Sequence, residues 1–197
     1  MTLLLASYLH PHLGKYVTGR VLYIDDAAFA MRQAPFAQEE LQTVGEAAET
    51  LVTLTVSQTD QADFRRELEL ADCIYVAGGE TFRLLHALRS TGADQLIINA
   101  VRDGKLYAGS SAGAIVAGPS IEPATVMDDP SVAPELTDYA GLNLTDFVAV
   151  PHAQGTTGPY PITTISKTVE EYGEEWKLLL LRDGQALYVD NENSMLV

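Results

Sequence analysis

The pentapeptide Gly-Ser-Ser-Ala-Gly at residues 109–113 constrains this chain more than any other feature of its sequence. It follows the strand-like run Lys-Leu-Tyr-Ala and precedes a helical run of mostly small residues, Ala-Gly-Ala-Ile-Val-Ala. A sharp strand-to-helix turn of this kind holds its central residue, Ser111, in a strained backbone conformation with the hydroxyl pointing outward. Gly109 and Gly113 permit the strand and the helix to approach closely. The pattern predicts either a turn that presents a nucleophilic serine or a structural Gly/Ser-rich turn of a parallel sheet.

Composition predicts a single domain over residues 1–197. The chain is 47% hydrophobic, which is enough to form a sizeable core. No stretch approaches the roughly 20 apolar residues that a membrane helix needs. Residues 1–7 lack the basic start of a signal peptide and are expected to form a strand. The single cysteine, Cys73, excludes a disulfide framework and favours a cytoplasmic location.

The net charge limits the partners of the chain. It is −15, with 12 lysines and arginines in all, so the sequence carries no basic footprint for nucleic acid or for an anionic membrane. The acidic residues are dispersed, and we interpret them as solubilising and not as a metal site. The chain is expected to act as a monomer or a homodimer without nucleic-acid or membrane partners.

Apolar runs alternate with helical patterns along most of the chain. The expected strands are residues 2–7, 20–25, 51–56, 73–77, 106–109 and 147–151, and the expected helices are residues 38–47, 61–70, 81–89 and 94–101. This alternation predicts an α/β fold in which a mostly parallel sheet carries helices on both faces. Near the C-terminus, runs 177–181 and 185–189 flank an Asp-Gly dipeptide, which is typical of a hairpin turn. We therefore expect an antiparallel hairpin at the sheet edge.

A serine nucleophile needs a base, and the chain offers four histidines. His152 directly follows the apolar run 147–151, just as Ser111 follows its own strand. The carboxyl ends of parallel strands meet at the crevice where open α/β sheets bind ligands. His152 is therefore the predicted base, and the alternative is a structural histidine. The remaining histidines are interpreted as loop or helix-packing residues: His10, His12 and His86.

An acyl-transfer site also needs two donors that stabilise a developing oxyanion. The N–H of Ala112, directly after Ser111, is one candidate. The turn Ala-Gly-Gly-Glu-Thr at residues 77–81 offers a second, because its glycines let the backbone approach a substrate, and we assign this donor to Gly79. The competing interpretation is phosphate binding at a helix N-terminus. The sequence lacks the glycine-rich dinucleotide and Walker A patterns, which disfavours that alternative.

These segments together resemble the peptidase E family, the aspartyl dipeptidases among the serine peptidases. Residues 76–85, Val-Ala-Gly-Gly-Glu-Thr-Phe-Arg-Leu-Leu, are similar to its Gly-Gly-Asn-Thr-Phe-x-Leu-Leu segment. Residues 107–114 resemble its nucleophile segment, and Pro151-His152 resembles the segment that carries its histidine. The resemblance implies a three-layer flavodoxin-like sandwich related to class I glutamine amidotransferases. It also implies a Ser-His-acid triad that works without metal or organic cofactor.

The chain departs from this family at the acid of the triad. The position that matches the family's aspartate is Val126, and the nearby carboxylates are Asp128 and Asp129. We favour Glu122, because it comes soon after the nucleophile helix and some relatives resemble it in carrying a glutamate near this point. Asp128 is the alternative acid. In a chain this acidic, either residue could instead be an ordinary loop carboxylate.

A second group of departures concerns the substrate. Glu80 replaces the family's asparagine, and we expect it to contact substrate together with Tyr160. The family's arginine, which holds the aspartate side chain of the substrate, has no counterpart, because no Arg or Lys occurs at residues 153–166. We therefore expect a serine peptidase that hydrolyses short peptides without strict specificity for N-terminal aspartate. The alternatives are a non-peptidase esterase or amidase and a catalytically inactive binding domain.

Overall fold

A computed structural model describes residues 1–156, 159–191 and 193–197 of the chain. Within these residues a seven-stranded sheet has the order β3-β2-β4-β5-β1-β8-β9. Its strands are β1 (Thr2–Ala6), β2 (Arg20–Ile24), β3 (Thr50–Leu54), β4 (Cys73–Val76), β5 (Leu106–Ser110), β8 (Ala186–Asp190) and β9 (Asn193–Leu196). The strands from β3 to β1 are mutually parallel, whereas β8 runs antiparallel to both β1 and β9.

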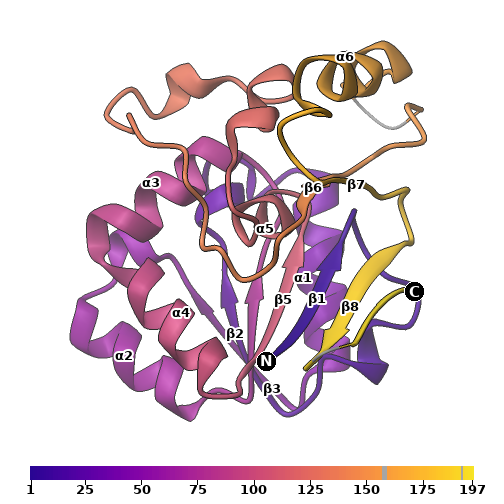
Figure 1. The fold of residues 1–197 in the computed structure, drawn as a ribbon. Coiled ribbons are helices and arrows are strands. Elements are labelled where there is room, and N and C mark those ends of the chain that lie inside the picture. The colour runs from indigo at the N-terminus through magenta and orange to yellow at the C-terminus, as the bar shows by residue number, and fades with distance from the viewer. Residues whose placement is uncertain (157–158, 192) are drawn as a thin grey trace.

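Helices cover both faces of this sheet and produce three layers (Figure 1). One face carries α2 (Gln61–Leu70), α3 (Thr81–Thr91), α4 (Ala93–Arg102) and α5 (Ala112–Val116), and the other carries α1 (Pro35–Ala47). Short 3-10 turns join several elements: η1 (Leu13–Lys15), η2 (Asp26–Met31) and η3 (Val56–Gln58). The first cluster of core side chains includes Phe64, Phe82 and Ile97, and the second includes Tyr23, Val44 and Tyr75. The expected three-layer α/β architecture with a mostly parallel sheet is thus confirmed.

The alternating side chains of the strands explain the two cores. Leu3 and Leu5 of β1 pack in the first core, whereas Leu4 between them packs in the second. Because successive side chains of a strand point to opposite faces, this apolar run buries both faces at once, as a central strand of a parallel sheet requires.

No helix among the described residues is long and apolar enough to cross a membrane.

The remaining segments lie above the carboxyl ends of the parallel strands (Figure 1). They include the short strands β6 (Val148–Val150) and β7 (Leu178–Leu180), which form a separate parallel pair. The helix α6 (Ile162–Tyr172) connects them, and the turns η4 (Glu122–Val126) and η5 (Pro130–Val132) precede them. Segments from the second half of the sequence therefore cover this edge of a sheet whose strands come mostly from the first half.

The C-terminal hairpin is present, but its position differs from the expectation. Residues 178–180 pair with β6 and residues 186–190 pair with β1, so the Asp-Gly turn between them joins two different sheets. The antiparallel hairpin is instead formed by β8 and β9. The Asp-Gly dipeptide correctly indicated that the chain turns between these two strands. It could not show that the first of them, β7, pairs with β6, which lies about 30 residues earlier in the chain.

Candidate active site

Ser111 occupies the turn between β5 and α5 with φ 47° and ψ −109°, a strained conformation for a residue with a side chain. The two flanking glycines make this turn possible. A Cβ on Gly109 would lie 2.4 Å from the carbonyl oxygen of Gly113, and a Cβ on Gly113 would lie 2.1 Å from that of Val76. Strand and helix therefore pack closer than any other residue type permits. The turn thus has the strained backbone and the close strand-to-helix approach that the pentapeptide predicts.

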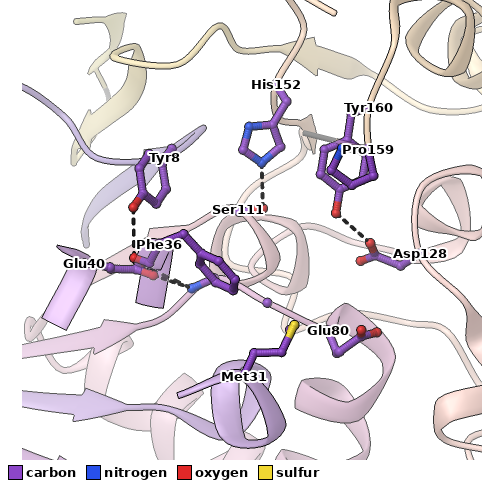
Figure 2. Close-up of a pocket in the computed structure, with 12 residues that line it drawn as sticks. Tyr8, Met31, Phe36, Glu40, Glu80, Ser111, Asp128, His152, Pro159 and Tyr160 are labelled. Atoms are coloured by element: carbon purple, nitrogen blue, oxygen red, sulfur yellow. Dashed lines mark hydrogen bonds between the residues drawn. The ribbon is translucent and has the colours of Figure 1, made fainter. Parts of the chain in front are cut away.

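The structure brings His152 to Ser111. The Nε2 atom of His152 lies 3.2 Å from the Ser111 Oγ (Figure 2). His152 follows β6 and also has a positive φ, 57°. Its backbone N–H donates to the Ser7 Oγ at 2.7 Å, and its ring stacks on Tyr160 with centroids 5.0 Å apart. Backbone and ring are thus both fixed, which places Nε2 within hydrogen-bond reach of the serine.

Asp183 holds the other ring nitrogen. Its Oδ1 lies 2.8 Å from the His152 Nδ1. Asp183 follows β7 and His152 follows β6, and because these strands run parallel and in register, their carboxyl ends lie side by side. The carboxylate also accepts hydrogen bonds from the Ser7 Oγ at 2.8 Å and from the Gln154 Nε2 at 2.7 Å. The Asp183 N–H in turn donates to the Gln154 Oε1 at 3.0 Å, so the carboxylate has one defined orientation.

This arrangement corrects the expected acid. Glu122 and Asp128 were the sequence-based choices, yet neither makes a hydrogen bond to His152 within the described residues. Glu122 begins η4, which packs against α6, where Thr125 and Tyr172 form a hydrogen bond of 3.1 Å. The chain after the nucleophile helix therefore leads to α6 and not back to the imidazole. The carboxylate at Nδ1 comes from the turn after β7 instead.

Gly79 and Ala112 were the expected oxyanion donors. Gly79 lines the same cavity as Ser111, and Ala112 directly follows Ser111 as the first residue of α5. Among the described residues, neither N–H donates a hydrogen bond to another protein group. Gly79 has φ 138°, and a Cβ there would lie 2.3 Å from the carbonyl oxygen of Ala27. Only glycine fits this turn. Because the Gly79 N–H has no protein acceptor among the described residues, it is available to a ligand.

Ser111 opens into a cavity of about 330 Å³. Figure 2 shows Tyr8 and Phe36 on one side of the serine, and Tyr160 with Asp128 on the other. None of the described residues that line the cavity is a lysine or an arginine. The lining residues are Tyr8, Met31, Phe36, Glu40, Gly78, Gly79, Glu80, Ser111, Asp128, His152, Pro159 and Tyr160. The lining thus combines the apolar side chains of Met31 and Phe36 with three carboxylates, Glu40, Glu80 and Asp128.

Asp128 and Glu80 are two of these carboxylates. Oδ1 of Asp128 accepts a hydrogen bond from the Tyr160 hydroxyl at 3.1 Å, and its Oδ2 accepts from the Thr81 hydroxyl at the start of α3. Burial raises the pKa of Asp128, although these hydrogen bonds oppose the shift. Burial and the nearby Asp128 raise the pKa of Glu80 as well. Both placements agree with Glu80 and Tyr160 as cavity residues, and Asp128 supports Tyr160 instead of orienting the histidine.

Glu40 is a carboxylate that the sequence analysis missed. It lies on α1 with no exposed surface and also lines the cavity. Its Oε1 accepts a hydrogen bond from the Tyr75 hydroxyl at 3.0 Å, and its Oε2 accepts from the Gly78 N–H at 3.2 Å. Burial raises the pKa of Glu40 to about 7. A glutamate on an amphipathic helix is ordinarily solvent-facing, so no local pattern indicated this position.

The raised pKa makes the stability of the protein depend on pH. Glu40 has a folded-state pKa of about 7 against an ordinary value of 4.5, so the folded chain retains a proton that the unfolded chain loses. This contribution is complete below pH 4.5 and is lost as the pH rises through 7, by on the order of 3 kcal/mol. Urea unfolding of wild type and Glu40→Gln at several pH values tests this. The variant is expected to gain stability relative to wild type as the pH rises, and parallel curves would contradict the shift.

Several residues of the site escaped the sequence analysis for one shared reason. Asp183 reaches the imidazole because β7 pairs with β6, and Ser7 and Gln154 hydrogen-bond to Asp183 and not to the ring itself. A usable signal did exist: reading residues 177–181 as a parallel partner of 147–151 would have placed Asp183 beside His152.

Within the described residues, no group of three or more His, Cys, Asp or Glu side chains is arranged to hold a metal ion.

Ser111, His152 and Asp183 contact one another in the order that the side chains of a serine hydrolase take. Comparisons with known proteins agree. The family model described as peptidase family S51 matches residues 3–197. An uncharacterized peptidase of Pasteurella multocida (strain Pm70) is 35% identical over 175 residues, which cover 88% of this chain and 76% of the relative. Peptidase E of Streptomyces coelicolor is 36% identical over 135 residues, which cover 66% of this chain and 53% of the relative.

A solved structure agrees over nearly its whole length. The crystal structure of a protein described as a peptidase E from Listeria monocytogenes EGD-e superposes with a TM-score of 0.89 at 28% identity, covering 100% of this chain and 97% of that one. This chain spans about half of the Streptomyces relative and about three quarters of the Pasteurella relative. The chain belongs to peptidase family S51 and is therefore a hydrolase of the serine peptidase class.

Proposed function

We propose that this protein hydrolyses short peptides through an acyl-enzyme formed on Ser111. The observation that carries the proposal is the continuous chain of contacts from Ser111 Oγ through the His152 imidazole to the Asp183 carboxylate. A serine with an ordinary structural role has no need of a base and an acid in this order. The strained turn under Ser111 supports the same proposal, because strain of this kind is retained where it aims a reacting group.

Each residue then has a defined task. His152 Nε2 takes the proton of the Ser111 hydroxyl as its oxygen attacks the peptide carbonyl carbon, and Asp183 stabilises the imidazolium that forms. The N–H groups of Gly79 and Ala112 bind the oxyanion of the tetrahedral intermediate. The C–N bond breaks as His152 returns its proton to the leaving amine. A water molecule, deprotonated by the same nitrogen, then attacks the ester carbon and releases Ser111.

The cavity supports a short substrate. Its volume of about 330 Å³ falls at the small end of the range for ligand pockets, which extends from roughly 300 to 1,000 Å³. The apolar wall formed by Tyr8, Met31 and Phe36 suits an apolar side chain of such a peptide. Tyr160 stacks on His152 and forms part of the opposite wall, so it can contact the substrate next to the reacting bond.

Incubation with a library of dipeptides and tripeptides, with products identified by mass spectrometry, tests the proposed function. We expect cleavage of a subset of the peptides by wild type and none by the Ser111→Ala variant. Turnover of simple esters with no turnover of any peptide would replace the proposal with an esterase activity. Absence of both activities would indicate a binding domain that keeps the fold.

The carboxylates of the cavity lead to a prediction about specificity. An aspartate side chain in a desolvated pocket needs a cationic partner, and the described lining residues offer none. Glu80 and Asp128 would in addition repel it. We therefore expect kcat/KM for Asp-Leu to be no higher than for Ala-Leu, Ser-Leu or Leu-Leu. A preference for Asp-Leu above about tenfold, or roughly 1.4 kcal/mol, would contradict this account.

The Glu80→Gln variant provides the matched comparison for this prediction. It keeps the size of the side chain and removes one of the carboxyl groups that line the cavity. The ratio of kcat/KM for Asp-Leu to that for Ala-Leu is expected to rise in this variant. An unchanged ratio would mean that the charge of Glu80 does not reach the bound substrate.

A further inference from the structure

Glu40 is a buried acid beside the nucleophile that the proposed chemistry does not use. It projects from α1 toward the turn formed by Gly78 and Gly79, where its carboxyl group accepts a hydrogen bond from the Gly78 N–H. A Cβ built on Gly78 would lie 3.3 Å from the Ser111 Cβ and 3.5 Å from the Glu40 Oε2. The carboxyl group and the nucleophile therefore lie on the same side of this turn.

The turn needs anchors because it contains two consecutive glycines. Glycine has the widest backbone freedom of any residue, so the N–H direction at Gly79 is not fixed by local sterics alone. Two hydrogen bonds bracket this residue. The Gly78 N–H donates to Glu40, at 3.2 Å to Oε2, and the Glu80 N–H donates to the carbonyl oxygen of Ala27 at 2.9 Å. With both neighbours held, the Gly79 N–H between them has a defined direction.

We propose that Glu40 is a positioning residue that holds the Gly78–Gly79 turn so that the Gly79 N–H points at the oxyanion. This inference rests on the proposed function, since it concerns a donor of that reaction. Glu40 does not contact the substrate; it acts through the backbone of the turn.

The cost of burying Glu40 supports this role. An apolar residue would fill the same space without the penalty of enclosing a carboxyl group. The side chains that face it are the serine Ser110 and three tyrosines, and none is a cation. Tyr75 donates to it from β4, Tyr23 stacks on Tyr75 from β2, and Tyr8 follows β1. Without a cation, the carboxyl group gains little from ion pairing. The carboxyl group instead provides an acceptor for the Gly78 N–H, which has no partner in a strand or a helix.

The rate of reaction of Ser111 with a fluorophosphonate, followed by intact-protein mass spectrometry, tests the inference. This reaction passes through a charged oxygen at the same donors, and it does not depend on knowing the natural substrate. Glu40→Met fills the space without an acceptor and is expected to lower the rate at least tenfold. Glu40→Gln keeps an acceptor oxygen and is expected to stay within about threefold of wild type. With a cleaved peptide, Glu40→Met is expected to lower kcat while KM changes by less than about threefold.

Thr168→Val is the matched control, because Thr168 is equally buried but lies on α6, where its hydroxyl donates to the Thr164 carbonyl. It should label at the wild-type rate. If Glu40→Met does not fold, Glu40→Asp replaces it, since a shorter side chain withdraws the carboxyl group from Gly78; the same loss is expected.

The outcomes separate the inference from the proposed function. Wild type that fails to label would overturn the proposed activation of Ser111, and the inference with it. Wild type that labels together with an equally reactive, folded Glu40→Met variant would overturn the inference alone. A loss in Glu40→Gln as large as in Glu40→Met would also overturn it, because an acceptor oxygen would then not be what matters.

Discussion

Replacing Ser111 by alanine is expected to lower kcat for peptide hydrolysis by about 10³-fold or more. The hydroxyl is the only proposed nucleophile, and His152 Nε2 lies 3.2 Å from it. The fold should survive, because Ser111 occupies a turn that Gly109 and Gly113 already permit, and alanine removes a single oxygen. Steady-state kinetics on the best peptide from the library, with thermal unfolding as a check of folding, measures both effects.

Ser110→Ala is the control for this experiment. Ser110 is the adjacent serine and is completely buried, and its hydroxyl makes no hydrogen bond to His152 within the described residues. Its replacement should leave kcat within a few-fold of wild type. Full activity in Ser111→Ala, or a large loss in Ser110→Ala alone, would mean that the nucleophile has been assigned to the wrong residue.

Replacing Asp183 by asparagine is expected to lower kcat by on the order of 10⁴-fold, the loss found when a triad aspartate is changed in this way. The amide keeps the size of the side chain but cannot stabilise the imidazolium, and its NH₂ group can favour the wrong tautomer of His152. Because Oδ1 also accepts from Ser7 and Oδ2 from Gln154, the folded structure has further hydrogen bonds that retain the turn.

Glu122→Gln provides the comparison, since Glu122 is the acid that the sequence favoured. It is expected to leave kcat and KM unchanged. The pattern of losses decides between the two carboxylates: a collapse of activity in Glu122→Gln with an active Asp183→Asn would restore the acid that was expected from the sequence.

The sequence predicted those parts of the molecule that depend on neighbouring residues. The strand-to-helix turn at Ser111 follows from steric limits within five residues, and the φ of 47° agrees with it. The helix over residues 61–70 has the bounds that its pattern predicts, because an N-cap aspartate, Asp60, accepts a hydrogen bond from the Ala62 N–H at its start. The alternation of strand and helix patterns likewise predicted a sheet with helices on both faces.

The parts that could not be predicted depend on contacts between distant segments. Asp183 is a functional candidate only because β7 pairs with β6, and its Asp-Gly turn looks like an ordinary hairpin when read locally. Glu40 shows the same limitation, since its partners Tyr75 and Gly78 come from β4 and the following turn. The topology of the sheet brings together the polar residues that support the site. Their spacing along the sequence does not indicate that they meet.

The central claim is that Ser111 carries an acyl group during turnover. Acid-quenching a reaction of the enzyme with an activated amino-acid ester, followed by digestion and mass spectrometry, tests it most directly. The account predicts a mass increase of one aminoacyl group on Ser111, absent from Ser111→Ala. Hydrolysis of the ester with the acyl group on another residue, or with equal turnover by Ser111→Ala, would contradict it.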